Sequence, residues 1–237
     1  MKIDPADIVT VCVTPCTSKK AEIARPERNA AGRYWKKPEI RDTDYCITTR
    51  ELAKWIKDAQ IDFNSLKDSD YDPIFGQSSG GGTIFGNSGG VMEAALRSAF
   101  YLVTGKNPGA DVFREVRGMK PWKEAEFNVG GTVVHTAVVH GLGNTRMLIE
   151  ALHRGEVHYD FVEVMACPGG CVGGGGQPIH DGEEYAERRA PVLYDIDRHK
   201  SLRFSHENPE VLKLYERFLG KPCSEKSHHL LHVEHQA

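Results

Sequence analysis

The chain has 237 residues, of which 40% are hydrophobic and 27% are charged, and its formal net charge at pH 7 is −3. These values are ordinary for a soluble globular protein of one large or two modest domains, and they give no sign of a nucleic-acid partner. No apolar run approaches the length of a membrane span, and the N-terminus lacks the apolar stretch of a secretory signal. We therefore expect a cytoplasmic protein.

The residue pattern predicts strands and helices that alternate along the chain. The expected strands are residues 8–13, 132–139 and 161–166, and the expected helices are residues 49–60, 89–104, 144–154 and 209–219. Helices between strands favour parallel pairing, so the predicted fold is α/β, with a mainly parallel sheet flanked by helices. Residues 24–45 are polar and irregular, which is typical of a surface excursion.

Helix ends are indicated by residues with known capping behaviour. Thr48 and Glu51 have the spacing of a capping box ahead of the helix predicted at 49–60. Ser88 and Asn144 are expected N-caps of the next two helices, and Gly105 is expected to end the first of them.

A glycine-rich loop with two cysteines is the most informative stretch of the chain. Cys167 and Cys171 directly follow the strand predicted at 161–166, and six of the eight residues from 169 to 176 are glycine. Such a backbone can bring its N–H groups against a bulky sulfur-rich or anionic ligand, which paired thiolates would hold. Zinc sites usually add a second knuckle of Cys or His ligands to such a pair. The pattern favours an iron–sulfur or related cluster over zinc.

Cys16 is the third ligand candidate, because it directly follows the strand predicted at 8–13. Ligands of parallel sheets gather beyond the carboxyl ends of the strands, so we expect Cys16 to meet Cys167 and Cys171 at one sheet edge. A second glycine-rich stretch, residues 75–90, opens into a predicted helix and would suit an anion or a polar cofactor edge. The other three cysteines are interpreted as packing or incidental residues: Cys12, Cys46 and Cys223.

Four motifs, in order along the chain, resemble the catalytic H-cluster domain of the iron-only (FeFe) hydrogenases. Residues 15–22 fit that family's Pro-Cys-x-x-Lys-x-x-Glu motif. Residues 165–178 fit its Met-Ala-Cys-x-x-Gly-Cys-x-x-Gly-Gly-Gly-Gln-Pro motif, with one more residue between Cys171 and Gln177 than the shortest form needs. Residues 85–97 resemble the start of the family's central helix, and residues from 205 onward resemble its C-terminus.

The resemblance implies an H-cluster, in which a 4Fe–4S cube is joined through a cysteine sulfur to a two-iron subsite bearing CO, cyanide and a bridging dithiolate. By motif position, Cys16, Cys167 and Cys171 are the implied metal ligands, and Cys171 bridges the cube and the two-iron subsite. Thiolates are the usual protein ligands of iron–sulfur clusters.

The resemblance also implies residues around that cluster. Lys19 would donate to a cyanide, and Glu22 would either hold Lys19 by ion pairing or relay protons. Met165 and Phe85 would pack around the diatomic ligands and exclude water. The remaining implied cofactor-binding residues are Gly86, Asn87, Gly173, Gly174 and Gln177.

The chain also departs from the family pattern. The family's Thr-Ser-Cys-Cys-Pro motif, which supplies the fourth cube ligand and a proton-transferring cysteine, is missing, as are its ferredoxin-like cysteine clusters, and Thr14 stands where many members have methionine. We therefore expect residues 1–222 to be the C-terminal portion of the H-cluster domain, without its first half, and residues 223–237 to be a polar tail. The chain is then a split-hydrogenase subunit, a truncated product or a non-hydrogenase relative.

The expected function is that of an anaerobic oxidoreductase catalysing reversible H2 oxidation and proton reduction. Its expected partners are H2 and protons, ferredoxin or a similar electron carrier, and a second protein chain carrying the missing Cys-Cys motif. The alternative is a non-catalytic iron–sulfur protein that acts as a sensor or a cluster-assembly factor. Hydrogenase activity requires the whole H-cluster, whereas the alternative function requires only the 4Fe–4S cube.

Overall fold

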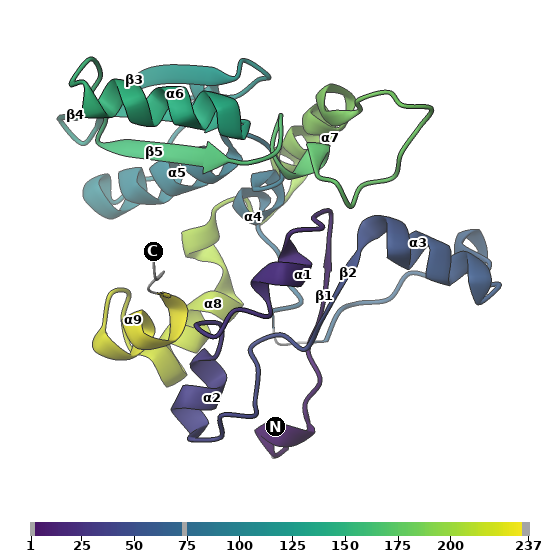
Figure 1. The fold of residues 1–237 in the computed structure, drawn as a ribbon. Helices are drawn as coiled ribbons and strands as arrows, with labels where there is room; N and C mark the ends of the chain where they lie inside the picture. Colours follow the sequence, from purple (N-terminus) through teal and green to yellow (C-terminus); the bar gives the residue numbers. More distant parts are fainter. Residues whose placement is uncertain (1–2, 73–74, 234–237) are drawn as a thin grey trace. The chain divides into compact units, whose positions relative to one another are not determined.

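Residues 3–72 and 75–233 are described by the computed structural model, in which the chain forms two compact units (Figure 1). The first unit comprises Met1–Ser69, Gly175–Pro178 and Val211–Ala237, and the second comprises Asp70–Gly174 and Ile179–Glu210. Each unit has its own small sheet. Among the described residues, no helix combines the length and the apolar character needed to cross a bilayer.

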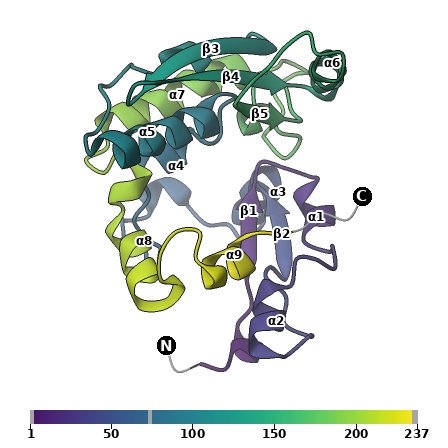
Figure 2. The ribbon, with the colours of Figure 1, turned by 90° about the vertical axis from the view of Figure 1, so that its left-hand side faces the viewer.

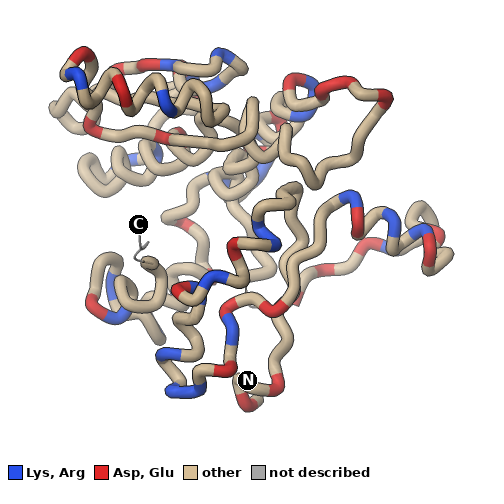
Figure 3. Tube along the Cα trace, in the orientation of Figure 1, with Lys and Arg blue, Asp and Glu red and all other residues tan. Residues whose placement is uncertain are grey.

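A two-stranded parallel sheet organises the first unit. Strand β1 (Val11–Thr14) pairs with β2 (Tyr45–Thr48). The helices of this unit are α1 (Lys19–Glu22), α2 (Ala30–Trp35), α3 (Thr49–Asp58) and α9 (Glu225–Leu231). Basic and acidic residues both occur along α3 (Figure 3). Residues 24–45, expected to be irregular, contain the short helix α2 and end at the first residue of β2.

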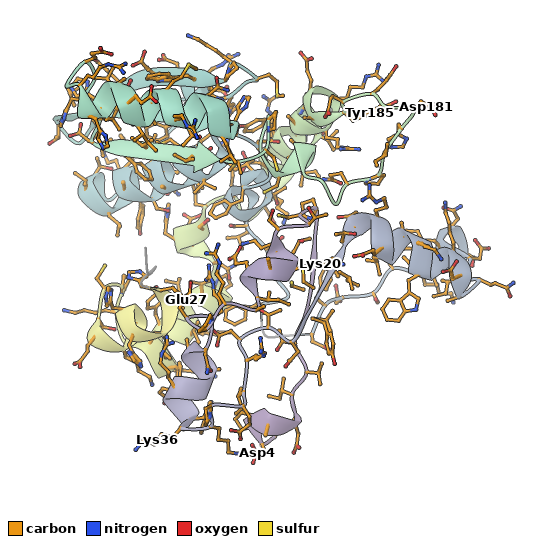
Figure 4. All side chains as sticks on the ribbon, viewed as in Figure 1. Asp4, Lys20, Glu27, Lys36, Asp181 and Tyr185 are labelled. Atoms are coloured by element: carbon orange, nitrogen blue, oxygen red, sulfur yellow. The ribbon has the colours of Figure 1, made fainter. Side chains whose placement is uncertain are left out.

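The predicted capping box is confirmed at the start of α3. The Thr48 side chain accepts a hydrogen bond from the Glu51 backbone N–H at 3.2 Å, and the Glu51 carboxylate accepts one from the Thr48 N–H at 2.8 Å. Lys20, labelled in Figure 4, donates to Glu51 at 2.6 Å and thereby joins α1 to α3. This hydrogen bond, aided by those from Thr48, lowers the pKa of Glu51 to about 2.

A three-stranded sheet organises the second unit, in the order β3 (Trp122–Val129), β4 (Thr132–His140), β5 (Phe161–Met165). Strands β3 and β4 run antiparallel side by side as a hairpin (Figure 2), and β5 is parallel to β4. The hairpin turns at Gly130 and Gly131, whose φ angles of 62° and 98° are those that a two-residue hairpin turn requires.

Two helices cover opposite faces of this sheet. Val138 of β4 packs with Met92 and Leu96 of α5 (Gly90–Thr104), whereas its neighbour Val139 packs with Leu148 of α6 (Leu142–His153). Successive strand residues point to opposite faces, so one strand serves both clusters. The remaining helices are α4 (Gly80–Ile84), α7 (Ala186–His199) and α8 (Pro209–Leu214), and a π-helical turn, Tyr215–Leu219, follows α8.

The prediction of one mainly parallel sheet is wrong. The strand predicted at 8–13 belongs to the sheet of the first unit, and those predicted at 132–139 and 161–166 belong to the sheet of the second unit. Each has a neighbour that the sequence analysis missed, β2 in one sheet and β3 in the other. The β-branched pattern identifies strands but carries no information on which strands pair.

The helices predicted at 89–104 and 144–154 are confirmed as α5 and α6, but the predicted N-caps Ser88 and Asn144 are wrong. Helix α5 follows Gly89, with φ of 92°, and α6 follows Gly141, with φ of 83°. The Asn144 side chain instead donates to the His140 carbonyl oxygen from within α6, at 2.8 Å. Gly105 does end α5, with φ of 70°, as predicted.

A buried carboxylate on β5 fixes the start of α5. Glu163 accepts hydrogen bonds from the backbone N–H groups of Gly89 at 2.6 Å and Met92 at 2.7 Å. These N–H groups lie at the start of α5, where backbone N–H groups have no hydrogen-bond acceptor within the helix. Lys123 lies on β3 in the same row across the sheet, and burial lowers its pKa to about 8.

Replacing this carboxylate should loosen the α5 terminus. Glu163→Gln places an amide NH2 where one oxygen accepted a hydrogen bond, so one backbone N–H loses its acceptor and the helix loses a favourable negative charge. We expect the free energy of unfolding to fall by about 2 kcal/mol, measured by urea denaturation. Glu126→Gln, on an exposed β3 side chain, is the control; an equal loss there would contradict the capping role.

Candidate functional site

Two segments with sequence-predicted site residues pack against each other in the second unit. We call residues 166–174 the cysteine loop and residues 85–89 the glycine turn, which lies between α4 and α5. The Ser88 N–H donates to the Gly169 carbonyl oxygen at 2.9 Å, and the Val172 N–H donates to the Gly86 carbonyl oxygen at 3.0 Å. The structure therefore brings Cys171, which precedes Val172, together with the predicted cofactor-binding segment.

This packing depends on a glycine next to Cys171. Gly170 has φ of 95°, and a Cβ atom there would lie 2.6 Å from the Ser88 nitrogen and 2.9 Å from the Gly86 carbonyl oxygen. These neighbours are backbone atoms, which cannot move aside as a flexible side chain can. The close approach of the cysteine loop to the glycine turn thus requires the absence of a side chain at this position.

Gly170→Ala should separate the two segments. We expect the second unit to lose about 2 to 3 kcal/mol of stability, because the substitution combines backbone strain at positive φ with a steric clash. Urea denaturation measures this loss. Gly118→Ala is the matched control, since Gly118 has φ of 102° but open space around its Cβ position. If both variants lose the same stability, the clash with the glycine turn contributes nothing.

The predicted residues of the second unit differ in exposure. Cys167 and Met165 are half-buried, whereas the Cys171 side chain is exposed and Phe85 is 47% exposed. A 3-10 turn, Cys171–Gly173, presents Cys171, and Gly174 closes it by donating its N–H to the Cys171 carbonyl oxygen at 2.9 Å. The loop therefore offers two thiols, of which that of Cys171 is the more exposed.

Helix α7, which the sequence analysis missed, holds both segments in place. The Arg189 guanidinium donates to the Val172 carbonyl oxygen at 2.9 Å, and the Asn87 amide donates to the Ala190 carbonyl oxygen at 3.0 Å. Asn87, which was predicted to bind the cofactor, is buried, and its hydrogen bond also holds the glycine turn against α7. The alternation of charged and apolar residues in residues 186–199 was the available signal, and Pro191 inside the helix obscured it.

A buried ionic cluster ties α7 to α5. Arg97 makes two hydrogen bonds to Asp197, each at 2.8 Å, and one to Glu93 at 2.7 Å. Glu93 also accepts from Arg117 at 2.6 Å. The Arg97, Glu93 and Asp197 side chains are at most 4% exposed. Burial opposes ionisation of Asp197, but the hydrogen bonds from Arg97 and Arg203 hold its pKa below the usual value.

In the first unit, Cys16 lies two residues beyond the end of β1, as predicted. The Thr14 hydroxyl donates to the Cys16 carbonyl oxygen at 3.0 Å and accepts from the Cys16 N–H at 3.2 Å. The segment Gly175–Pro178, which includes the half-buried Gln177, belongs to this unit. Its Gly176 N–H donates to the Pro15 carbonyl oxygen at 2.9 Å, so this stretch lies beside the predicted Cys16 motif.

Lys19 and Glu22 form an ion pair on α1, with 2.6 Å between Nζ and Oε2. Arg28 contacts the other carboxylate oxygen at 2.6 Å. The hydrogen bond from Lys19, with the charges of Lys19 and the neighbouring arginines, lowers the pKa of Glu22 against the opposing effect of burial. The ion pair is the contact that the first of the two roles expected for Glu22, holding Lys19, requires.

The three predicted cysteine ligands do not share a sheet edge. Cys16 follows β1 in the first unit, whereas Cys167 and Cys171 follow β5 in the second. Within the described ranges, no group of three or more His, Cys, Asp or Glu side chains is arranged around a single metal ion. None of the six cysteines, all of which lie in those ranges, forms a disulfide.

Comparison with known proteins identifies two family matches. The family described as iron only hydrogenase large subunit, C-terminal domain, matches residues 1–175. The family described as iron hydrogenase small subunit matches residues 183–237. These two regions meet at the ionic cluster, since Arg97 lies in the first and Asp197 in the second.

Individual relatives fall into two functional groups. The NADP-reducing hydrogenase subunit HndD of Solidesulfovibrio fructosivorans is 50% identical over 96% of this chain, which spans 38% of that relative. The cytosolic Fe-S cluster assembly factor narfl of Xenopus tropicalis is 32% identical over 99% of this chain, which spans 49% of that protein. A variant of the [FeFe]-hydrogenase HydA1 from Chlamydomonas reinhardtii is 37% identical, with a TM-score of 0.78, and the match covers 97% of this chain and 63% of that one.

Proposed function

Because the chain belongs to the iron-only hydrogenase large-subunit family and matches its C-terminal domain, we propose that it forms part of the catalytic domain of an FeFe hydrogenase. The proposed reaction is the reversible interconversion of H2 with protons and electrons, which an external carrier such as ferredoxin exchanges with the enzyme. The chain spans about two fifths of the length of its hydrogenase relative HndD. The proposal includes a partner or further polypeptide that carries the Cys-Cys motif.

The observation that carries this proposal is the contact between the glycine turn and the cysteine loop. It joins Val172, the neighbour of Cys171, to Gly86, the neighbour of Phe85, through a backbone hydrogen bond, and the glycine at position 170 permits the close approach. The Cys171 side chain is exposed on the 3-10 turn, where a ligand can reach its sulfur. Rigid support of a ligand is typical of metal centres.

The residues present fit an H-cluster in the chemistry of their donors. Cys16, Cys167 and Cys171 would hold it through thiolates, the usual ligands of iron–sulfur clusters. When bound, the H-cluster supplies the redox chemistry of hydrogen. Gly86, Gly173 and Gly174 carry no Cβ that would keep a large ligand at a distance, and they lie in or beside the segments that hold Cys171.

Other residues would control the surroundings of the cluster. Lys19 offers an ammonium donor to an anionic ligand, and its ion pair with Glu22 limits the positions that the side chain adopts. Phe85 and Met165 would exclude water, which strengthens hydrogen bonds inside the site. Gln177 would contribute an amide from the segment beside Cys16.

The proposed partner, whether chain or segment, should cover an apolar face of the first unit. Val11, Val13 and Tyr45 point to one side of the two-stranded sheet and are 50%, 49% and 62% exposed. Two strands alone bury little apolar surface, and their unpaired edges favour pairing with other chains. We expect the isolated chain to self-associate, which gel filtration with light scattering measures. A monodisperse monomer over a wide concentration range would contradict this expectation.

Infrared spectroscopy tests the proposed function. The chain is expressed anaerobically together with the hydrogenase maturation machinery and a polypeptide that carries the missing Cys-Cys motif. Absorption bands of metal-bound CO and cyanide are the expected result. A cube without these bands contradicts the hydrogenase proposal.

A bare cube would instead support the second candidate, a cluster-assembly or sensor function. The observation that favours this candidate is the 32% identity to an Fe-S cluster assembly factor over nearly the whole chain. The two candidates share the cysteine ligands, so iron content alone does not separate them. Hydrogen evolution with a reduced carrier, tested alongside the infrared measurement, does.

A further inference from the structure

Two cysteines that the sequence analysis interpreted as packing or incidental residues face each other in the first unit. Cys12 of β1 and Cys46 of β2 are direct register partners in the parallel pair. Neighbouring strands lie about 4.8 Å apart, which is within the range of about 4.4 to 6.8 Å that disulfides span between Cα atoms. The backbone spacing therefore suits a covalent bond between these two residues.

The side chains of this pair already interact. Burial, followed by a hydrogen bond with the Cys46 thiol, raises the pKa of Cys12. Both cysteines are in the thiol state, and Cys46 is 8% exposed whereas Cys12 is half-buried. Cys12 is thus the member of the pair that an external reagent reaches first.

A hydroxyl group connects this pair to the predicted cluster ligand. The Thr14 Oγ1 atom lies 3.8 Å from the Cys46 sulfur, and the same hydroxyl makes both hydrogen bonds to the Cys16 backbone. A change in the position of the Cys46 sulfur therefore acts on the hydroxyl that fixes the backbone of Cys16.

We propose that Cys12 and Cys46 form a dithiol modification site that a low-molecular-weight disulfide converts into an intramolecular disulfide. The site is separate from the proposed cluster chemistry and does not depend on it. In the first step the Cys12 thiolate attacks the reagent disulfide, giving a mixed disulfide and releasing one reagent thiolate. In the second step the Cys46 thiolate attacks the Cys12 sulfur and releases the second thiolate. The protein loses two electrons and two protons, and the reagent disulfide is reduced to two thiols.

Peptide mapping after reaction with oxidised glutathione tests the proposal. The folded full-length chain is oxidised, alkylated and digested with trypsin, which gives peptides 3–19 and 42–50. Peptide 3–19 contains both Cys12 and Cys16. The decisive sample is therefore the Cys16→Ser variant, because Cys12 is then the only cysteine of this peptide. We expect the two peptides to be linked in the wild type and in Cys16→Ser, and to separate again with dithiothreitol. In Cys16→Ser the mass of the linked pair should be two hydrogen atoms below the sum of the two peptides.

Two further variants test the order of the steps. Cys46→Ala should stop the reaction at a glutathione adduct on Cys12, and Cys12→Ser should lose the link. Loss of the link in Cys16→Ser would show that Cys16 was the true partner and would overturn the proposal. Adducts without any link in folded Cys16→Ser would overturn it as well. Circular dichroism before digestion tests whether each sample is folded. If the Cys46 variant does not fold, the Cys16→Ser result still decides whether Cys12 and Cys46 form the link.

Discussion

Cys171→Ala should abolish attachment of the two-iron subsite in the assembled, matured protein. The proposed function assigns the only bridge between the cube and the two-iron unit to this sulfur, and a methyl group offers no replacement ligand. We expect complete loss of the CO and cyanide infrared bands and of hydrogen evolution, with part of the cube's iron retained. The measurement is infrared spectroscopy together with iron analysis of the matured complex.

The matched control for this substitution is Cys223→Ala, because Cys223 is also exposed and belongs to the first unit rather than to the cysteine loop. Its bands and activity should equal those of the wild type. Cys16→Ala should give an intermediate result, mainly a weakened cube. Retention of the CO bands in Cys171→Ala would refute the assigned bridge.

Asp197→Asn should destabilise the second unit by about 3 to 5 kcal/mol, the cost of breaking a buried ion pair from one side. The variant leaves Arg97 charged, almost fully buried and without its bidentate carboxylate. Urea denaturation gives the change in the free energy of unfolding. Asp195→Asn on the same helix is the control, since that exposed carboxylate pairs with the exposed His199 of the same helix, and it should change stability by less than about 0.5 kcal/mol.

The effect of Asp197→Asn should depend on pH in a defined direction. The pKa of Asp197 is lower in the folded protein than in the unfolded chain, so its contribution is fully present above the unfolded value of about 3.9. That contribution is lost as the pH falls through the folded-state value. The stability difference between wild type and variant should therefore be constant near neutrality and shrink in strong acid. A difference that grows in acid would contradict this assignment.

Local signals in the sequence predicted local structure well. The Thr48 capping box, the end of α5 at Gly105 and the position of Cys167 directly after β5 all depend on residues within a few positions of one another. Strand pairing does not depend on nearby residues in this way. The partner of β2 lies 34 residues earlier in the chain, and the partner of β3 lies across a hairpin. The sequence analysis therefore located the cysteine ligand candidates but placed them at a single sheet edge.

The supporting residues of the site were missed for a related reason. Glu163 and Arg97 have the composition of ordinary charged surface residues, and only the packed structure shows that they are buried and paired with groups 71 to 100 positions away. Cys46 was likewise interpreted as incidental because its partner lies 34 positions earlier in the sequence. Pairings between distant residues are properties of the fold rather than of any local pattern.

The Arg97–Asp197 pair has a kinetic consequence. It joins a segment that matches a large-subunit family to one that matches a small-subunit family, and here both belong to one polypeptide. Docking of α7 is therefore a first-order event with an effective concentration set by the connecting chain, whereas two separate polypeptides would meet at a rate that depends on their abundance. In this protein, the rate at which α7 seats against α5 should be the same in dilute and in concentrated solution.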